Sequence, residues 1–213
     1  CGTSAEALIQ AASGIDKNDV VRIYPVTFSG ENPDPCFGFM PVEGWRKFVV
    51  SAYCADLVSY TEAEDRVDFP RLLYLLSVFP QGFTVWWGEL KNGERYPVGY
   101  TGWYYTDGYT FSQVERGAVI TSRFFSPSRE PTPYLYLYNY SIHPGLKSTV
   151  FSRTLIKEYV SQVYRVDYAG LFCAAVSVDG IRVAEKFGMR EAGFITAPDG
   201  TASDRLLLVR KGG

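Results

Sequence analysis

The segment 134–189 constrains the fold of this 213-residue chain more than any other. Residues 134–142 alternate tyrosine with other side chains, which is typical of a strand, and a Pro-Gly pair ends the run. Apolar residues follow at helical spacing over 151–166. Residues 171–176 are all apolar, as expected of a strand buried on both faces, and helical spacing then returns. The order strand, turn, helix, strand, helix predicts a mixed α/β fold.

The first third of the chain predicts one strand and two helices. Residues 20–28 are rich in β-branched and aromatic side chains, which favours a strand. Residues 43–60 carry apolar side chains at helical spacing. Asp68 is expected to cap a second helix, whose apolar body is 72–79.

Two hairpins are predicted further along the chain. Asn92-Gly93 separates the aromatic-rich runs 83–90 and 96–105 and indicates a tight hairpin turn. Residues 193–211 indicate a terminal hairpin with Pro-Asp-Gly in its turn. Both hairpins favour antiparallel pairing, so the sheet is expected to be mainly antiparallel.

The length fits one domain with a sizeable core. We expect an N-terminal arm over 1–18 and a single domain over 19–213. Residues 106–133 are expected to form an insertion, with an extra strand over 117–125. Insertions near a cleft often carry specificity, but this one is equally consistent with a surface excursion.

Composition excludes several classes of function. The net charge of −2 leaves no broad basic field for nucleic acid. The four cysteines match no zinc pattern, and a single histidine excludes a histidine-rich metal site, so no metal is expected. The 16 tyrosines and 4 tryptophans indicate either a ring-lined pocket or rings that fill half-buried strands.

The chain begins with Cys1, which leaves two expectations about its location. Either it is a trimmed sequence of a cytoplasmic protein, or Cys1 is the processed, lipidated end of a bacterial envelope protein. There is no apolar run of about 18 residues, so no transmembrane segment is expected.

Two motifs within the segment 134–189 resemble motifs of a known family. Ile-His-Pro at 142–144 and Ala-Glu-Lys-Phe-Gly-Met at 184–189 are similar to motifs of the GCN5-related N-acetyltransferases (GNAT). The resemblance covers the last ~80 residues well and the order of elements more loosely from Val20 onward. It implies a central sheet splayed between its fourth and fifth strands, with helices on both faces.

The resemblance also implies an activity. In that family an acyl group, usually acetyl from acetyl-CoA, passes to an amine by direct attack in a ternary complex. The implied partners are acetyl-CoA and a small-molecule or peptide amine, and a homodimer is compatible with this reading. The aromatic runs 83–87 and 103–105 are then expected to line the acceptor side of the cleft.

The turn into the helix is the expected cofactor site, because a helix N-terminus offers unpaired amides to a pyrophosphate. The residues assigned to the cofactor are Ser141, Ile142, Lys147, Ser148, Thr149, Val150, Ser152, Arg153 and Ser177. The family has glycines at the positions of Val150 and Ser152. Their loss damages the site if Val150 must adopt positive φ, but not if the turn runs in the right-handed helical region. The alternative is an ordinary helix start capped by Ser148 or Thr149.

Catalytic residues are less clearly indicated. Ala184 stands where the family usually has a tyrosine acid, so Tyr140 is the first replacement, with Tyr138 and Ser177 behind it. Glu89 is the first candidate for the base and Glu115 the second, while His143 is expected to be structural. These departures leave two rivals to acetyl transfer. One is a catalytically degenerate binding protein, and the other is an enzyme that uses longer acyl chains or an acyl carrier protein.

Overall fold

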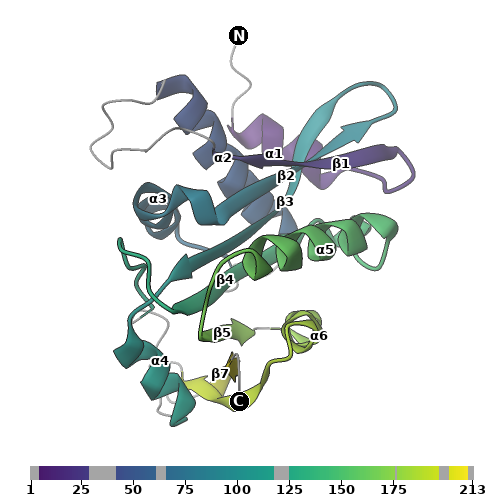
Figure 1. Cartoon of the computed structure of the whole chain (residues 1–213). Coiled ribbons are helices and arrows are strands. Elements are labelled where there is room, and N and C mark those ends of the chain that lie inside the picture. Colours follow the sequence, from purple (N-terminus) through teal and green to yellow (C-terminus); the bar gives the residue numbers. More distant parts are fainter. Residues whose placement is uncertain are drawn as a thin grey trace. The chain divides into compact units, whose positions relative to one another are not determined.

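The computed structural model describes residues 5–28, 42–60, 66–117, 125–175, 177–196 and 202–210 (Figure 1). Its helices and strands are α1 (Ala5–Ser13), β1 (Val20–Thr27), α2 (Val42–Ser59), α3 (Phe69–Val78), β2 (Phe83–Leu90), β3 (Arg95–Tyr105), α4 (Gly108–Glu115), β4 (Tyr134–Ile142), α5 (Val150–Tyr164), β5 (Gly170–Ala175), α6 (Val178–Lys186), β6 (Arg190–Thr196) and β7 (Ala202–Arg210). Short 3-10 turns at Pro80–Gly82 and Pro144–Leu146 precede β2 and α5. The mixed α/β class predicted from the sequence is confirmed.

The strands form one sheet in the order β1-β2-β3-β4-β5-β7-β6. The pairs β1–β2, β2–β3, β5–β7 and β6–β7 are antiparallel, whereas β4 and β5 are parallel. The parallel pairing joins residues 134–137 to 170–173, although β4 itself continues to Ile142. The mainly antiparallel sheet and its separation between the fourth and fifth strands are therefore as predicted.

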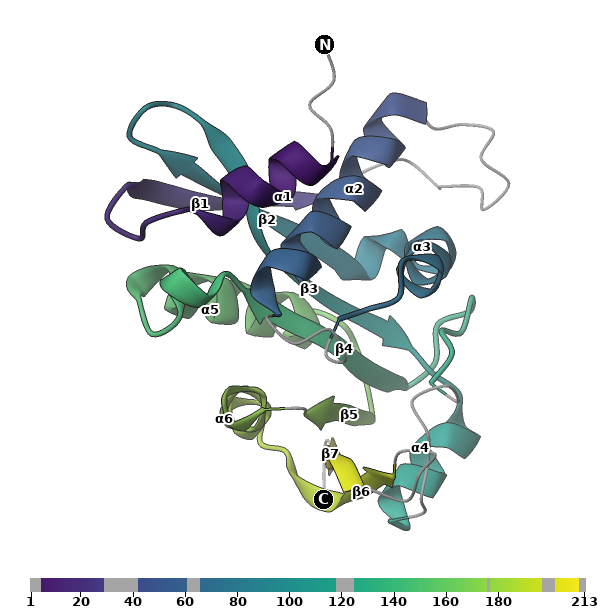
Figure 2. The ribbon, with the colours of Figure 1, turned by 180° about the vertical axis from the view of Figure 1, so that it is seen from behind.

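The chain divides into two compact units that share strands β3 and β4 and helix α5. The first unit is Cys1–Gly102 with Asn139–Lys157, and the second is Trp103–Tyr138 with Glu158–Gly213. In the first unit, α2 crosses one face of the strands and the first half of α5 lies on the other (Figures 1 and 2).

The core of the first unit includes the N-terminal helix. Its buried cluster consists of Ala12, Ile15, Val20, Val58, Trp86, Val98, Ile142, Leu146 and Leu155. Ala12 and Ile15 belong to the end of α1 and the turn after it, inside the segment expected to be an arm. The end of that segment is thus part of the packed core.

A buried polar network joins α2 to β3 and β4 in the first unit. Asp56 on α2 is 1% exposed and accepts hydrogen bonds from the Tyr100 hydroxyl at 2.8 Å and the Val67 amide at 2.9 Å. Tyr60 donates to Asn139 at 2.8 Å, and the Asn139 amide donates to the Tyr100 carbonyl at 3.1 Å. Burial raises the pKa of Asp56 to about 6, against the pull of its two donors.

Aromatic rings fill the core of the second unit. Phe111 stacks on Tyr134 with 4.7 Å between ring centroids. The ring centroids of Phe125 and Phe172 lie 4.8 and 4.9 Å from that of Tyr136. Tyr104 is fully buried and donates its hydroxyl to the Phe125 carbonyl. In the two runs expected to line an acceptor cleft, Phe83, Trp86, Trp103 and Tyr104 are buried, which fits the alternative of rings that fill the strands.

Some local predictions need correction, and others lie outside the residues that the structure describes. The insertion contains helix α4, which was not expected from its Gly, Thr and Ser content, and Asp107 caps it through the Thr110 amide at 2.7 Å. Most of the extra strand predicted over 117–125 lies outside the described residues, as does the turn of the terminal hairpin. Asp68 holds the cap position of α3, but its side chain makes no cap hydrogen bond.

We predict that Gly99→Ala destabilises the protein by about 2 kcal/mol or more in urea unfolding. Strand β3 bulges at Val98, because Trp86 pairs with Gly99 while Trp87 pairs with Pro97. A Cβ at Gly99 would overlap the Ser141 carbonyl oxygen and lie 3.1 Å from the Ile142 Cα, so backbone would have to move. The control is Gly44→Ala at an exposed position of α2, where no atom lies within 4 Å of the added Cβ, and stability should stay level or rise by up to about 1 kcal/mol. Equal unfolding midpoints for the two variants would contradict this packing.

We also predict that Asp56 makes stability fall as pH rises. Because its folded pKa of about 6 exceeds the unfolded value near 3.9, the folded state holds the proton more tightly, and stability declines between about pH 4 and 6. Asp56→Asn keeps both hydrogen bonds, since the amide can accept from Val67 and donate to the Tyr100 oxygen, but it does not titrate. Relative to Asp56→Asn, the wild type should lose on the order of 2 kcal/mol of unfolding free energy from pH 4 to pH 7. Parallel stability curves for the two proteins would show that Asp56 is not a protonated buried acid.

Candidate functional site

The turn between β4 and α5 has a distinctive backbone. After the short 3-10 turn at Pro144–Leu146, Lys147 is extended with φ −60° and ψ 145°. Ser148 then adopts φ 61°, and it is the sole non-glycine residue with positive φ in the described part of the chain. Helix α5 begins two residues later at Val150. A left-handed serine is unfavourable, so the surrounding packing must hold this conformation.

Several amides of this turn lack an acceptor among the described residues. The amides of Leu146 and Lys147 are used within the turn, at 2.9 and 3.2 Å from the carbonyls of His143 and Pro144. The amides of Ser148, Thr149, Val150 and Ser152 have no hydrogen-bond partner within the described ranges. A left-handed residue followed by the open first turn of a helix is a site that attracts anions.

The missing glycines are explained by which residue takes the positive φ. Val150 is the first residue of α5 and lies in the right-handed region, so its β-branch is not strained. Ser148 takes the left-handed position instead. The expected cap is also present, since the Thr149 hydroxyl accepts from the Phe151 amide at 3.2 Å. Capping and open amides therefore occur together, although the sequence presented them as alternatives.

The side chains assigned to the turn divide into two groups. The Thr149 hydroxyl donates to the Leu146 carbonyl at 2.6 Å and the Ser152 hydroxyl donates to the Thr149 carbonyl at 3.0 Å, so both serve the turn itself. Lys147 and Arg153 are exposed, and neither forms an ion pair with any described residue. They are the cationic side chains among the residues assigned to this turn.

His143 fixes the start of the turn. The ring is buried, and its Nδ1 accepts from the Gly145 amide at 3.0 Å. Burial lowers the pKa of His143, against the opposite effect of the nearby backbone of Ser13 and Ala12. The ring is therefore neutral at neutral pH. The geometry fits the expected structural role.

Strand β4 contributes backbone more than side chains. The Ser141 hydroxyl is buried and lies 3.3 Å from both the amide and the carbonyl of Tyr100. Ile142 is in the core, and Tyr140 is half-buried against the same cluster. The side chains of Ser141 and Ile142 are thus occupied internally.

One assigned residue, Ser177, lies in the second unit and caps α6, because its hydroxyl accepts from the Gly180 amide at 3.1 Å. Ala184, where the resemblance implied a missing tyrosine acid, lies in the same unit and is 2% exposed. A larger side chain cannot be accommodated there without repacking.

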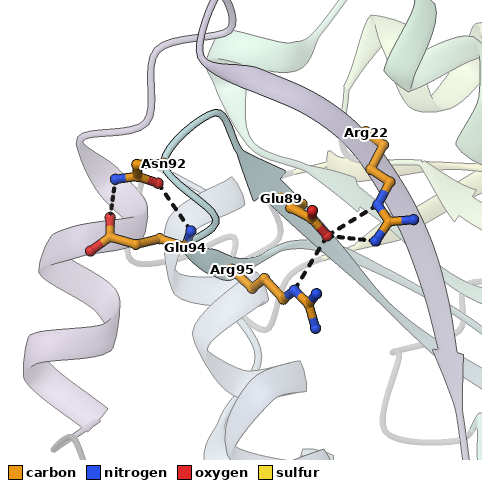
Figure 3. A network of polar contacts seen from close by, with 5 residues as sticks. All are labelled: Arg22, Glu89, Asn92, Glu94 and Arg95. Atoms are coloured by element: carbon orange, nitrogen blue, oxygen red, sulfur yellow. Dashed lines mark hydrogen bonds and ion pairs between the residues drawn. The ribbon is translucent and has the colours of Figure 1, made fainter.

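The candidate base Glu89 is held by two arginines (Figure 3). Its carboxylate lies 2.7 Å from Arg22 and 3.3 Å from Arg95. The hydrogen bond from Arg22 is the main reason that the pKa of Glu89 lies below its usual value. Glu89 is therefore ionised but weakly basic. Glu115, the second candidate, is an exposed residue that ends α4.

Other kinds of site find little support. The described residues include no group of three His, Cys, Asp or Glu side chains placed to hold a metal ion. Cys54 and Cys173 are free, buried thiols whose pKa burial raises to about 11 and about 12. Among the helices that the structure describes, none has the length and apolar character needed to cross a bilayer.

Comparison with solved structures shows the fold. Similar chains include the loading GNATL domain of CurA from Lyngbya majuscula (TM-score 0.58, 12% identity) and the GphF GNAT-like decarboxylase in complex with isobutyryl-CoA (0.57, 14%). Ard1 from Thermoplasma volcanium is similar at TM-score 0.53 and 13% identity. Each comparison covers 89% of this chain and 98% of the other. No family model and no curated protein matches the sequence. The chain has the fold of the GNAT acetyltransferases.

Proposed function

We propose that this protein binds a CoA thioester through the turn before α5 and transfers its acyl group, most simply acetyl, to a primary amine. The observation that carries the proposal is the set of open amides at Ser148, Thr149 and Val150. A pyrophosphate offers the oxygens that these donors lack, and the positive end of α5 adds to the attraction.

Two cations support a diphosphate ligand over a smaller anion. Lys147 and Arg153 flank the open amides in the sequence and are exposed. Each can pair with a phosphate oxygen without breaking an ion pair among the described residues. The isobutyryl-CoA complex of the GphF GNAT-like decarboxylase supports the same class of ligand, since that protein shares this fold.

The reaction is less constrained than the ligand. Proteins with this fold include acetyltransferases and a decarboxylase, so the fold alone does not select the chemistry. In acyl transfer the amine nitrogen forms a bond to the thioester carbonyl carbon, the carbon–sulfur bond breaks, and the thiolate takes up a proton. The amine proton goes to a base or to water. A thiol pKa near 8.5 makes the thiolate an acceptable leaving group.

We assign the acid to Tyr140 and test Glu89 as the base. Tyr140 is half-buried on the strand that leads into the turn and belongs to the same unit. Glu89 is ionised, as a base must be, but its arginine partners weaken it. The buried Ala184 favours one rival, a protein that binds the cofactor without catalysis, because the usual acid is missing there.

We predict that CoA binds the wild type measurably in calorimetry and raises its Tm. The double variant Lys147→Ala/Arg153→Ala should weaken binding about 10-fold to 100-fold, because two charge-assisted contacts are lost. Lys91→Ala removes an exposed cation that lies 3.8 Å from Asp19 and should leave the affinity unchanged. A wild-type Tm that does not move in millimolar CoA would refute the proposed function.

Lys157→Ala separates the two donor classes. Lys157 lies one turn further along α5 than Arg153, so a carrier protein could reach it more readily than the pyrophosphate does. If free CoA is the donor, this substitution should change neither the affinity for CoA nor the transfer rate. A loss of transfer from an acyl carrier protein alone would favour the carrier.

With an acceptor found in a panel of primary amines and peptides, we predict unequal effects of two substitutions. Tyr140→Phe should lower kcat about 10-fold or more without changing CoA affinity, because only the hydroxyl is removed. Glu89→Gln should lower kcat less than about 3-fold, since a base of depressed pKa contributes little. CoA binding with no transfer to any acceptor would favour the non-catalytic rival, and the reverse order of the two effects would reassign the roles.

A further inference from the structure

We propose that Lys17, in the connection between α1 and β1, binds the ribose 3′-phosphate of CoA and so selects CoA over ligands that lack this group. The inference rests on the proposed function, because it adds a second phosphate contact to the same site. Every residue that the sequence assigned to the cofactor lies at or after Ser141, whereas Lys17 belongs to the segment expected to be an N-terminal arm.

The connection that carries Lys17 lies against the turn with the open amides. A Cβ at Gly145 would lie 3.6 Å from the Ile15 carbonyl oxygen, so the two backbones approach each other closely at these residues. Ile15 also shares one buried cluster with Leu146. Both ribbon views place the connection from α1 to β1 and the connection from β4 to α5 at the same end of the first unit (Figures 1 and 2). Lys17 and Lys147 follow Ile15 and Gly145, respectively, by two residues, so both lie near this contact.

Hydrogen bonds of the neighbouring residues fix the backbone at Lys17. The Asp19 amide donates to the Asp16 carbonyl at 3.0 Å, which closes a turn with Lys17 at its corner. The Asn18 amide donates to the Asp16 side chain at 2.8 Å. The Asp19 carbonyl accepts from the Lys91 amide at 2.9 Å, which ties the turn to the hairpin of β2 and β3. The position of Lys17 is therefore defined by its surroundings, although its own side chain is exposed.

The ammonium of Lys17 is available to an anion. Lys17 forms no ion pair with any residue that the structure describes. Each of the two carboxylates in its turn has another partner, since Asp16 accepts from the Asn18 amide and Asp19 lies 3.8 Å from the Lys91 ammonium. A phosphate that approaches this turn can therefore pair with Lys17 without displacing a carboxylate of the described residues.

The position of Lys17 favours a phosphate other than the pyrophosphate. In the proposed site the pyrophosphate takes the open amides together with Lys147 and Arg153, which belong to the turn and to α5. Lys17 belongs to the neighbouring connection, so it is placed for a group outside those amides. CoA carries one such group, a phosphate monoester on its ribose, with a charge of about −1.5 to −2 at pH 7. A lysine ammonium suits this group, because it acts as a point charge with rotating donors.

The test compares three variants of the full chain with the wild type. Lys17→Gln removes the charge, and Lys17→Arg keeps it. Arg46→Gln is the matched control, because Arg46 is an exposed cation on α2 that forms no ion pair with a described residue. Helix α2 lies on the face of the strands opposite to the first half of α5 (Figures 1 and 2). Calorimetric titrations measure the Kd of each protein for CoA and for 3′-dephospho-CoA, which differ only in the ribose phosphate, and the Tm of each variant verifies its folding.

We expect the wild type to bind CoA about 3-fold to 10-fold more tightly than 3′-dephospho-CoA at low salt, because one charge-assisted contact is gained. Lys17→Gln should lose this preference by weakening the binding of CoA alone, while its affinity for 3′-dephospho-CoA stays that of the wild type. Lys17→Arg should keep most of the preference, and Arg46→Gln should keep both affinities. Added salt should reduce the preference of the wild type, since the contact is exposed and therefore screened.

Three outcomes would overturn this assignment and leave the proposed function standing, since CoA still binds in each of them. The first is a wild type that binds CoA and 3′-dephospho-CoA equally well. The second is a preference for CoA that survives Lys17→Gln, which places recognition of the 3′-phosphate on other residues. The third is an equal loss of affinity for both ligands in Lys17→Gln, which assigns Lys17 to the pyrophosphate. A wild type that binds neither ligand refutes the proposed function and this inference together.

Discussion

The turn that follows β4 combines two features that rarely occur together. Its backbone amides lack acceptors among the described residues, yet the residues that carry them hold one defined conformation. Open amides normally find acceptors by local rearrangement, because an unpaired donor is unfavourable wherever water is scarce. Here the amides of Ser148, Thr149 and Val150 have no acceptor among the residues that the structure describes, and Ser148 also has a strained backbone. Such a turn can exist only if its two flanks are rigid.

Each flank is rigid for a different reason. On the helix side, the Thr149 hydroxyl accepts from Phe151 and donates to Leu146, which closes the turn on itself. On the strand side, β4 is tied to β3 by side chains, since Asn139 and Ser141 both bond the Tyr100 backbone. Tyr100 in turn meets the buried Asp56 of α2. The hydrogen-bond network of Asp56, Tyr100, Asn139 and Ser141 therefore holds strand β4 just before the turn with the open amides.

The sequence allowed most helices and strands to be predicted, but not the conformation of the turn before α5. Period-two and helical spacing located most of the strands and helices, because burial of one face repeats along many residues. The left-handed Ser148 could not be predicted, since its conformation comes from contacts with the residues around it and not from its own preference. The hydrogen bond from the Tyr60 hydroxyl to Asn139 joins residues 79 positions apart in the chain, and no local pattern encodes such a pairing. Helix α4 was missed for the opposite reason, because packing of Phe111 and Val114 in the core overrides a weak local preference.

In the proposed function, ligand binding and the chemical step depend on different kinds of group. The proposed pyrophosphate site consists of backbone amides and two exposed cations, so it does not require glycine at positions 150 and 152 when Ser148 takes the positive φ. A proposed acid differs, because it is a side chain, and the buried Ala184 cannot donate a proton. A site built from backbone amides can persist after substitution if the backbone conformation is kept. A function that needs a particular side chain is lost when that side chain is replaced. The proposed CoA site therefore depends on the path of the backbone, whereas an acid that protonates the thiolate has to be a residue other than Ala184.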